Sequence, residues 1–127
     1  VRGEAPAPDR MDWGTVSWVC NPVTTGAEQL TVTDVTIDRG KGHDFHKHPR
    51  QDEVIVVVEG EIEQWLEQEK RLLRPGDAVV IPADAVHASF NVGEGTARIT
   101  VILGPCDGPT GYEVVDVFHE QPWASLR

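Results

Sequence analysis

Apolar and polar residues alternate along much of the chain with a period of two, which is typical of β-strands. Residues 30–33 (LTVT) alternate in one phase and residues 35–38 (VTID) in the opposite phase, which predicts a bulge near Asp34. Residues 54–58 (VIVVV) form a continuous β-branched run, which is typical of a strand buried on both faces. Further strands are predicted at residues 62–66, 78–81, 86–90, 97–103 and 112–118.

Turn residues, rather than helical signals, separate these strands. Residues 74–77 (RPGD) suit a type II turn, because proline fixes φ and glycine accepts a positive φ. Residues 64–72 (QWLEQEKRL) have a helical alternative, but they lie between two glycine turns and lack a cap, so we expect a hairpin with its tip at Gln68-Glu69. About eight short strands at regular spacing predict an all-β sandwich or barrel.

The length and composition limit the number of domains. The chain has 127 residues, of which 39% are apolar and 25% are charged, as expected for one folded domain over residues 1–127. Its core barrel should cover about residues 28–118. Residues 1–12 contain two prolines and few apolar side chains, which predicts a flexible N-terminal arm or one that docks on a partner.

Net charge and cysteine content limit which partners and which cellular compartment are expected. A net charge of −10 argues against nucleic acid and anionic membranes as partners, and no apolar run approaches the ~20 residues of a membrane span. Cys20 and Cys106 are too few for a disulfide scaffold and lack zinc-motif spacing, so a reduced, cytoplasmic protein is expected. The chain begins at Val1 rather than Met, which is compatible with removal of a leader. For an exported chain, a Cys20–Cys106 bridge is the alternative.

Four side chains have the spacing of a metal site. His46 and His48 are two residues apart, so on a strand they point to the same face. Glu53 begins the next predicted strand, and His87 comes from a separate strand. Three neutral imidazoles and one carboxylate suit a mid-row divalent metal and leave up to two octahedral positions for water or substrate.

Two segments then resemble the two motifs of the cupin family. The first is Gly40-x5-His46-x-His48-x4-Glu53-x6-Gly60, in which every diagnostic position is filled. Fifteen residues separate its last glycine from the second motif, which is the short spacing of compact microbial cupins.

The second motif departs from the family pattern at one position. It reads Gly76-x5-Pro82-x-Asp84-x2-His87-x3-Asn91, with Asp84 where cupins usually have glycine. Aspartate tolerates left-handed backbone better than most residues, so the turn is expected to survive.

The resemblance implies a double-stranded β-helix (cupin) barrel, jelly-roll-like, of the RmlC-like superfamily. It also implies that His46, His48, Glu53 and His87 bind a divalent transition metal (Fe, Mn, Zn, Ni or Cu) inside the barrel. A homodimer is expected partly from the family, and the VIVVV run and four tryptophans suggest more buried sheet than one small barrel needs.

Four further residues are candidates for contacts with a substrate or with the ligands. Gln64 should point into the barrel, either to orient a substrate or as a hydrogen-bonded core amide. Simple alternation places His43 on the outer face unless the Gly42 turn reorients it toward the ligands. Arg98 would bind a carboxylate if its face is interior, although a solvated face is expected, and Tyr112, in the predicted last strand, is the candidate acid or base.

Gln51 and Asp52 lie in the turn beside the predicted ligands, where they would tune a metal or simply form a surface turn.

The family includes dioxygenases, sugar isomerases, decarboxylases, lyases and plain binding modules, so the motif argues for a metal site rather than a reaction. We expect an enzyme that acts on a small oxygenated organic molecule. Dioxygenase-like chemistry is slightly favoured, because the sequence places no free acid or base firmly in the interior. The alternatives are a sugar or small-acid isomerase or lyase, and a non-catalytic protein that binds a small ligand.

Overall fold

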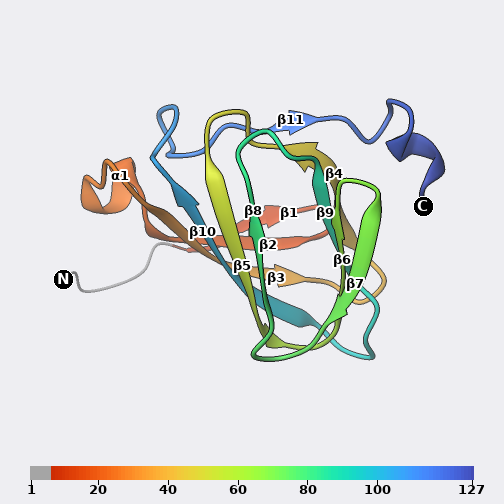
Figure 1. Ribbon diagram of the computed structural model, residues 1–127. Coiled ribbons are helices and arrows are strands. Elements are labelled where there is room, and N and C mark those ends of the chain that lie inside the picture. The colour runs from red at the N-terminus through yellow and green to blue at the C-terminus, as the bar shows by residue number, and fades with distance from the viewer. Residues whose placement is uncertain (1–6) are drawn as a thin grey trace.

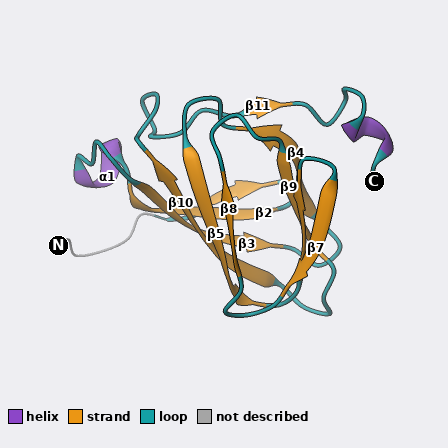
Figure 2. Cartoon of the chain, in the orientation of Figure 1, coloured by secondary structure: helices purple, strands orange, loops and turns teal. Residues whose placement is uncertain are grey.

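The computed structural model describes residues 7–127, which form two antiparallel β-sheets with a small helical turn at one side (Figures 1 and 2). The large sheet contains, in spatial order, β1 (Asp9–Met11), β2 (Gly14–Cys20), β3 (Thr31–Ile37), β10 (Ala97–Gly104), β5 (Asp52–Glu59) and β8 (Ala78–Ile81). The small sheet contains β11 (Val115–Asp116), β4 (Gly42–Lys47), β9 (His87–Asn91), β6 (Ile62–Leu66) and β7 (Glu69–Leu73). The helical elements are α1 (Pro22–Thr25) and a 3-10 turn (Trp123–Ser125).

The space between the sheets holds the main core. The inner face of the large sheet is almost entirely aliphatic, and its fully buried side chains include Ile37, Ile55, Val57 and Ile99. Burying such a side chain contributes roughly 1.5–3 kcal/mol, so this face supplies much of the stability of the fold.

A second apolar cluster covers the outer face of the small sheet. Phe45 of β4, Trp65 of β6 and Phe90 of β9 pack there against Val117 and Trp123 of the C-terminal segment. This cover explains why every residue of β9 is buried, because one face of the strand lies in the core and the other lies under the C-terminal segment.

Several predicted local features are confirmed. Residues 62–73 form the β6–β7 hairpin, with its tip at Glu67-Gln68, one residue before the predicted position, and Glu67 has φ 53°. In the predicted type II turn, Asp77 N donates to Arg74 O at 2.9 Å and Gly76 has φ 94°. The sequence analysis missed β2 and α1, the latter capped by the Asn21 side chain.

The predicted bulge near Asp34 is wrong. β3 pairs with β10 in unbroken register, and its inward residues are Thr31, Thr33, Val35 and Ile37. The phase of the sequence pattern changes because two inward positions are threonines. Thr31 is accommodated in the core because its hydroxyl donates to Gly111 O at 2.8 Å.

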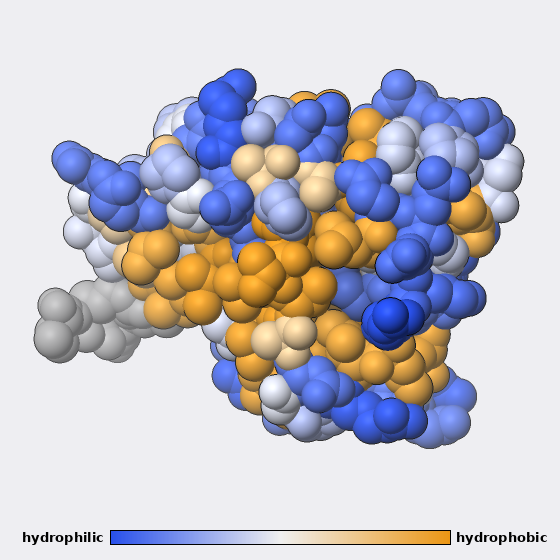
Figure 3. All heavy atoms as spheres, viewed as in Figure 1, coloured by the Kyte–Doolittle hydropathy of each residue, from blue (hydrophilic) through white to orange (hydrophobic). Residues whose placement is uncertain are grey.

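The prediction that residues 54–58 are buried on both faces is also wrong for the single chain, because only one face of this strand is buried in it. Their outward side chains lie on the outer face of the large sheet, where Val58 is 40% exposed and Val80 of the neighbouring β8 is 65% exposed. Figure 3 shows apolar side chains gathered over this region of β5, β8 and β10. We call the outward residues Val54, Val58, Val80 and Ile102 the outer apolar face.

The N-terminal arm lies partly on the protein's own sheet rather than free. Residues 9–11 pair with β2, Trp18 Nε1 donates to Asp9 at 2.9 Å, and Arg10 forms an ion pair with Asp38. The part of the predicted arm at residues 1–6 lies outside the described residues.

Cys20 and Cys106 are free thiols, so the alternative bridge between them is absent. No helix within residues 7–127 has the length and hydropathy that a membrane-spanning segment requires.

Candidate metal centre

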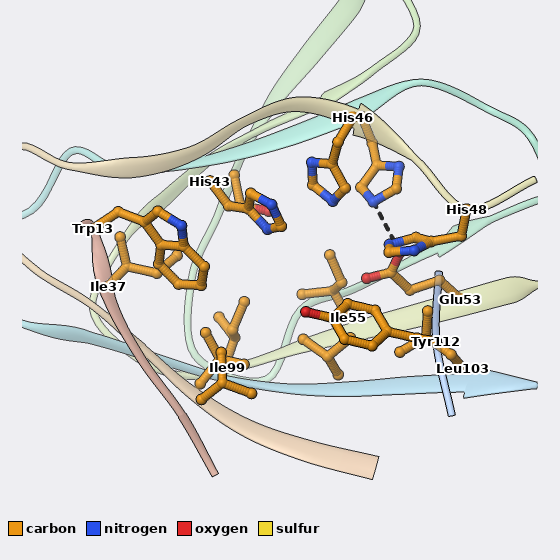
Figure 4. Close-up of a pocket in the computed structure, with 15 residues that line it drawn as sticks. Trp13, Ile37, His43, His46, His48, Glu53, Ile55, Ile99, Leu103 and Tyr112 are labelled. Carbon is orange, nitrogen blue, oxygen red and sulfur yellow. Dashed lines mark ion pairs between the residues drawn. The ribbon is translucent and has the colours of Figure 1, made fainter. Parts of the chain in front are cut away.

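The three motif histidines meet between the two sheets. His46 of β4 lies directly opposite His87 of β9, and His48 follows the end of β4. One ring nitrogen from each lies within 4.8 Å of the others, and all three side chains are at least 96% buried. Glu53, which is also 4% exposed, reaches the same point from β5 in the opposite sheet (Figure 4).

The Nδ1 atom of each histidine is bound to a backbone carbonyl. The acceptors are the carbonyl oxygens of Asp44, Glu113 and Ala85, which bind His46, His48 and His87 at 2.7, 2.8 and 3.0 Å. A carbonyl only accepts, so each Nδ1 carries the hydrogen and each neutral ring presents its Nε2 lone pair to the cluster. Hydrogen bonds of this kind are what fix the tautomer and ring orientation of metal-binding histidines.

Glu53 is the fourth residue of this set, and its carboxylate lies close to two of the histidine rings without a well-aligned hydrogen bond to either. Its Oε1 lies 2.8 Å from His87 Nε2 and 3.2 Å from His48 Nε2. Nevertheless, Glu53 Oε1 and His87 Nε2 are buried and make no well-aligned hydrogen bond within residues 7–127. Unsatisfied buried polar atoms are rare, and two that face each other fit a cation held between them. The donor set therefore fits a divalent transition metal.

Electrostatics favour the protonation states that bind a metal at two of these residues. Burial alone would raise the pKa of Glu53, but the neighbouring His87 and His48 outweigh it and hold that pKa well below its usual value. Burial, together with His43 and the other histidines, lowers the pKa of His46. Burial also opposes charge on His87, yet the Glu53 carboxylate raises its pKa overall, which favours a proton on His87 in competition with a metal.

His43 lies on the cavity side, as in the alternative in which the chain reorients it toward the ligands, and not on the outer face that simple alternation predicts. His43 pairs with Ser89 and His46 with His87, which means that β4 has one more residue than β9 in this interval. This bulge turns His43 inward, where its ring stacks on that of His46 at 3.6 Å and on that of Trp13 at 4.8 Å between centroids. Burial, aided by the charge of nearby His87, lowers its pKa to about 3.

A cavity of about 50 Å³ adjoins the four residues. Its opposite wall is aliphatic and comes from the large sheet, whose lining residues are Val16, Val35, Ile37, Ile55, Ile99, Val101 and Leu103. Trp13, His43, Ser89 and Tyr112 complete the lining, and Figure 4 shows the phenol of Tyr112 pointing into the space between the two walls.

Tyr112 lines the cavity from a loop, because the predicted strand at 112–118 is reduced to the two residues of β11. Its ring lies 5.6 Å from that of His48 and 5.2 Å from that of Trp18. Burial, then Glu53, raises the pKa of Tyr112, so its hydroxyl stays protonated at neutral pH.

Gln51 positions this loop, a role that the sequence analysis did not assign to it. Its fully buried amide donates to Pro105 O at 2.7 Å and to Gly111 O at 2.8 Å, and it accepts from Glu113 N at 3.4 Å. Gln51 thereby holds both Tyr112 and the Glu113 carbonyl that orients His48. The signal that could have revealed it, a polar residue in a buried turn, is visible only once the loop at 105–113 is placed.

The other two candidate residues do not line the cavity. Gln64 is buried, accepts a hydrogen bond from Ser89 Oγ at 2.6 Å and donates to Trp65 O at 3.1 Å, as expected for a core amide. Arg98 lies on the outer face, where it forms an ion pair with Asp34 at 2.9 Å that raises the Arg98 pKa.

The unusual residue of the second motif keeps the expected turn. Asp84 has φ 68°, its backbone N–H donates to His48 O at 2.9 Å, and its carboxylate lies 3.0 Å from Lys47 Nζ.

Comparisons with known proteins agree with this architecture. Polyketide synthase CurC from Streptomyces cyaneus is 34% identical over 98 residues, which cover 77% of this chain and 64% of CurC. The chain thus spans less than two thirds of that relative's length. The structure of KdgF from Halomonas sp. matches 81% of this chain and 88% of its own, with 28% identity and a TM-score of 0.69.

A more distant structure supports the fold alone. Oxalate decarboxylase from Lactobacillus farciminis matches 89% of this chain with a TM-score of 0.77, but it is 21% identical and only 34% of it is covered.

The sequence profile of the Cupin_2 family, described as the cupin domain, matches residues 33–103. Because this match covers more than half of the chain, the protein belongs to the cupin family.

Proposed function

We propose that this protein is a metal-dependent enzyme that acts on a small oxygenated organic molecule. His46, His48, His87 and Glu53 would hold a divalent transition metal. The observation that carries the proposal is the convergence of three Nε2 lone pairs, fixed by backbone carbonyls, on a buried carboxylate without an aligned partner.

The adjoining cavity supports a substrate at the metal. A bound metal would polarise a carbonyl or enolate oxygen or, as iron, support reactions with dioxygen. The aliphatic wall would exclude water and pack against the carbon skeleton, while the Tyr112 hydroxyl would donate a hydrogen bond to a ligand oxygen. Glu53 is the only carboxylate among the described residues that line the cavity, so dioxygenase-like chemistry, which needs fewest protein acids and bases, is placed ahead of isomerase or lyase chemistry.

The relatives are compatible with such substrates. CurC carries the name of a polyketide synthase, and polyketides are carbon chains rich in carbonyl and enol groups. This similarity favours an oxygenated carbon skeleton over a purely ionic substrate.

The compartment and assembly belong to the same proposal. Free cysteines support a cytoplasmic location. The outer apolar face supports a homodimer, because a second copy would cover it.

Metal analysis of protein purified without added metal tests the proposal. We expect about one transition metal per chain. Iron would favour oxygenase chemistry, whereas zinc or nickel would favour the isomerase or lyase alternative. Protein that purifies without metal, and that fails to bind Fe²⁺, Mn²⁺, Zn²⁺, Ni²⁺ or Cu²⁺ in titrations, would contradict the metal site. Stoichiometric metal with no conversion of any bound small molecule would favour the non-catalytic alternative.

A further inference from the structure

No cationic side chain of the described residues lines the cavity beside the candidate ligands. Among residues 7–127, the lining side chains include neither lysine nor arginine, and Glu53 is the only one that is anionic at neutral pH. With a divalent metal and neutral histidines, the site would therefore carry a net charge of about +1, which balances one negative charge on a ligand.

Cations close in sequence to the site are engaged elsewhere. Lys47 and Arg50, which flank His48, pair with Asp84 and Asp107 at 3.0 Å each. Arg98 pairs with Asp34 on the outer face. None of these three side chains lines the cavity, so none is placed to neutralise a second ligand charge.

A groove that adjoins the cavity is negative as well. Trp13 and His43 line both the cavity and an adjoining outer groove, whose other lining residues are Asp12, Gly42, Asp44, Asp116 and Phe118. Three carboxylates and no lysine or arginine thus line this groove within the described part of the chain. A dianionic ligand that entered through this groove would be repelled by its carboxylates, and on binding it would leave one buried charge uncompensated, which is costly at low dielectric.

From this charge arrangement we infer that the site selects ligands that arrive uncharged and lose at most one proton on binding, such as enols, phenols and hydroxamic acids, and that it rejects dicarboxylates. The inference rests on the proposed metal site and names the substrate class of that same site. The aliphatic wall then contacts the carbon skeleton, and the Tyr112 hydroxyl donates to a ligand oxygen. The match to oxalate decarboxylase extends to the fold but not to a preference for its dianionic substrate.

Two small chelators of similar size test this inference on the zinc-loaded protein. Acetohydroxamic acid is uncharged in solution and binds metals after losing one proton, whereas oxalate is a dianion, and both chelate through two oxygens. Zinc is suitable because it is not redox-active. Affinities for the loaded protein are measured by calorimetry and compared with the affinities of the same two compounds for Zn²⁺ in buffer.

We expect the acetohydroxamate-to-oxalate affinity ratio to be at least about tenfold higher on the protein than on aqueous zinc. An equal or lower ratio on the protein would overturn the inference. Because this measurement uses the unmodified protein, it stands even if a variant fails to fold.

A matched pair of variants then moves the charge. Tyr112→Lys places an ammonium at the cavity, whereas Thr110→Lys adds the same charge at an exposed position two residues away. Oxalate affinity should rise about tenfold in Tyr112→Lys and stay within about twofold in Thr110→Lys. An equal effect of both substitutions, or an effect of neither in protein that retains zinc and the β-rich circular dichroism spectrum, would count against the inference.

The two proposals fail in different ways. If zinc does not bind at all, the metal site itself is wrong. If zinc binds at one per chain and oxalate is preferred over acetohydroxamate, the metal site stands and only the assigned ligand class is wrong.

Discussion

The two walls of the cavity are built by different kinds of interaction. On the small-sheet side, three histidine rings are each held by one hydrogen bond from Nδ1 to a backbone carbonyl. On the large-sheet side, aliphatic residues such as Ile37 and Ile99 are held by packing alone, and Glu53 is the exception. Hydrogen bonds are directional and packing is not, so the first wall fixes atoms in position while the second fixes mainly a volume.

This difference implies that metal affinity and stability depend on different residues. Substitutions on the histidine wall should change metal binding more than folding. Substitutions on the aliphatic wall should change folding more than metal binding.

The strongest test removes two candidate ligands together. His46→Ala with His48→Ala should abolish stoichiometric metal, with affinity lowered by more than about 1,000-fold, because two of four donors are lost. Elemental analysis measures the metal, and far-UV circular dichroism should still show a β-rich protein. Full metal content in this double variant would refute the site.

A matched pair on β5 examines the opposite wall. Ile55 is 2% exposed and faces the cavity, whereas its neighbour Val56 faces outward and is half-buried. Ile55→Ala should lower the free energy of unfolding by about 2–4 kcal/mol and leave metal stoichiometry unchanged. Val56→Ala should cost about 1 kcal/mol or less. Denaturant titration checks both values. A loss of metal in folded Ile55→Ala would contradict the expectation that the aliphatic wall affects stability but not metal binding.

Gln51 should affect both metal binding and stability, because it supports His48 through the loop at 105–113. Gln51→Met retains the approximate volume but removes the amide donor to the Pro105 carbonyl and one of the donors to the Gly111 carbonyl, which still accepts from Thr31. We expect a loss of about 1–3 kcal/mol in stability and of about 10–100-fold in zinc affinity. The exposed Gln68 at the hairpin tip offers a control, since Gln68→Met should change neither quantity. Unaltered zinc affinity in Gln51→Met would show that His48 does not need this support.

The smallest expected effect is a difference in pH dependence. The pKa of His87 is raised in the folded protein, so its contribution to stability is fully present below the unfolded value near 6.5 and is lost as pH rises through the folded value. From pH 6.5 upward, the loss of this contribution should lower the Tm of chelator-treated protein, while zinc binding should strengthen because the competing proton leaves. Scanning calorimetry of both forms checks this, and Glu53→Gln should flatten the fall in the metal-free form. A Tm that rises with pH in metal-free protein but not in Glu53→Gln would reverse the assigned sign.

The sequence predicted the four candidate ligands, because their positions follow from short-range spacing and two family motifs. It left the side on which His43 lies open, because the bulge depends on how β4 pairs with β9, a strand more than forty residues away. The support by Gln51 was out of reach for a similar reason, since its partners lie in a distant loop. The inward face of β3 was assigned wrongly at Thr31, because a polar residue is acceptable in the core there through its hydrogen bond to Gly111 O, a partner that the sequence does not reveal.

The stacked rings of Trp13, His43 and His46 have a practical consequence. Trp13 is half-buried and stacks on the ring of His43, which stacks on the candidate ligand His46, so a metal at the proposed site would change the electronic surroundings of an indole. We therefore expect the emission of Trp13 to change when the proposed centre takes up a metal, which would allow titrations without any added dye. The signal difference between the native protein and Trp13→Phe isolates this one indole from the other three tryptophans.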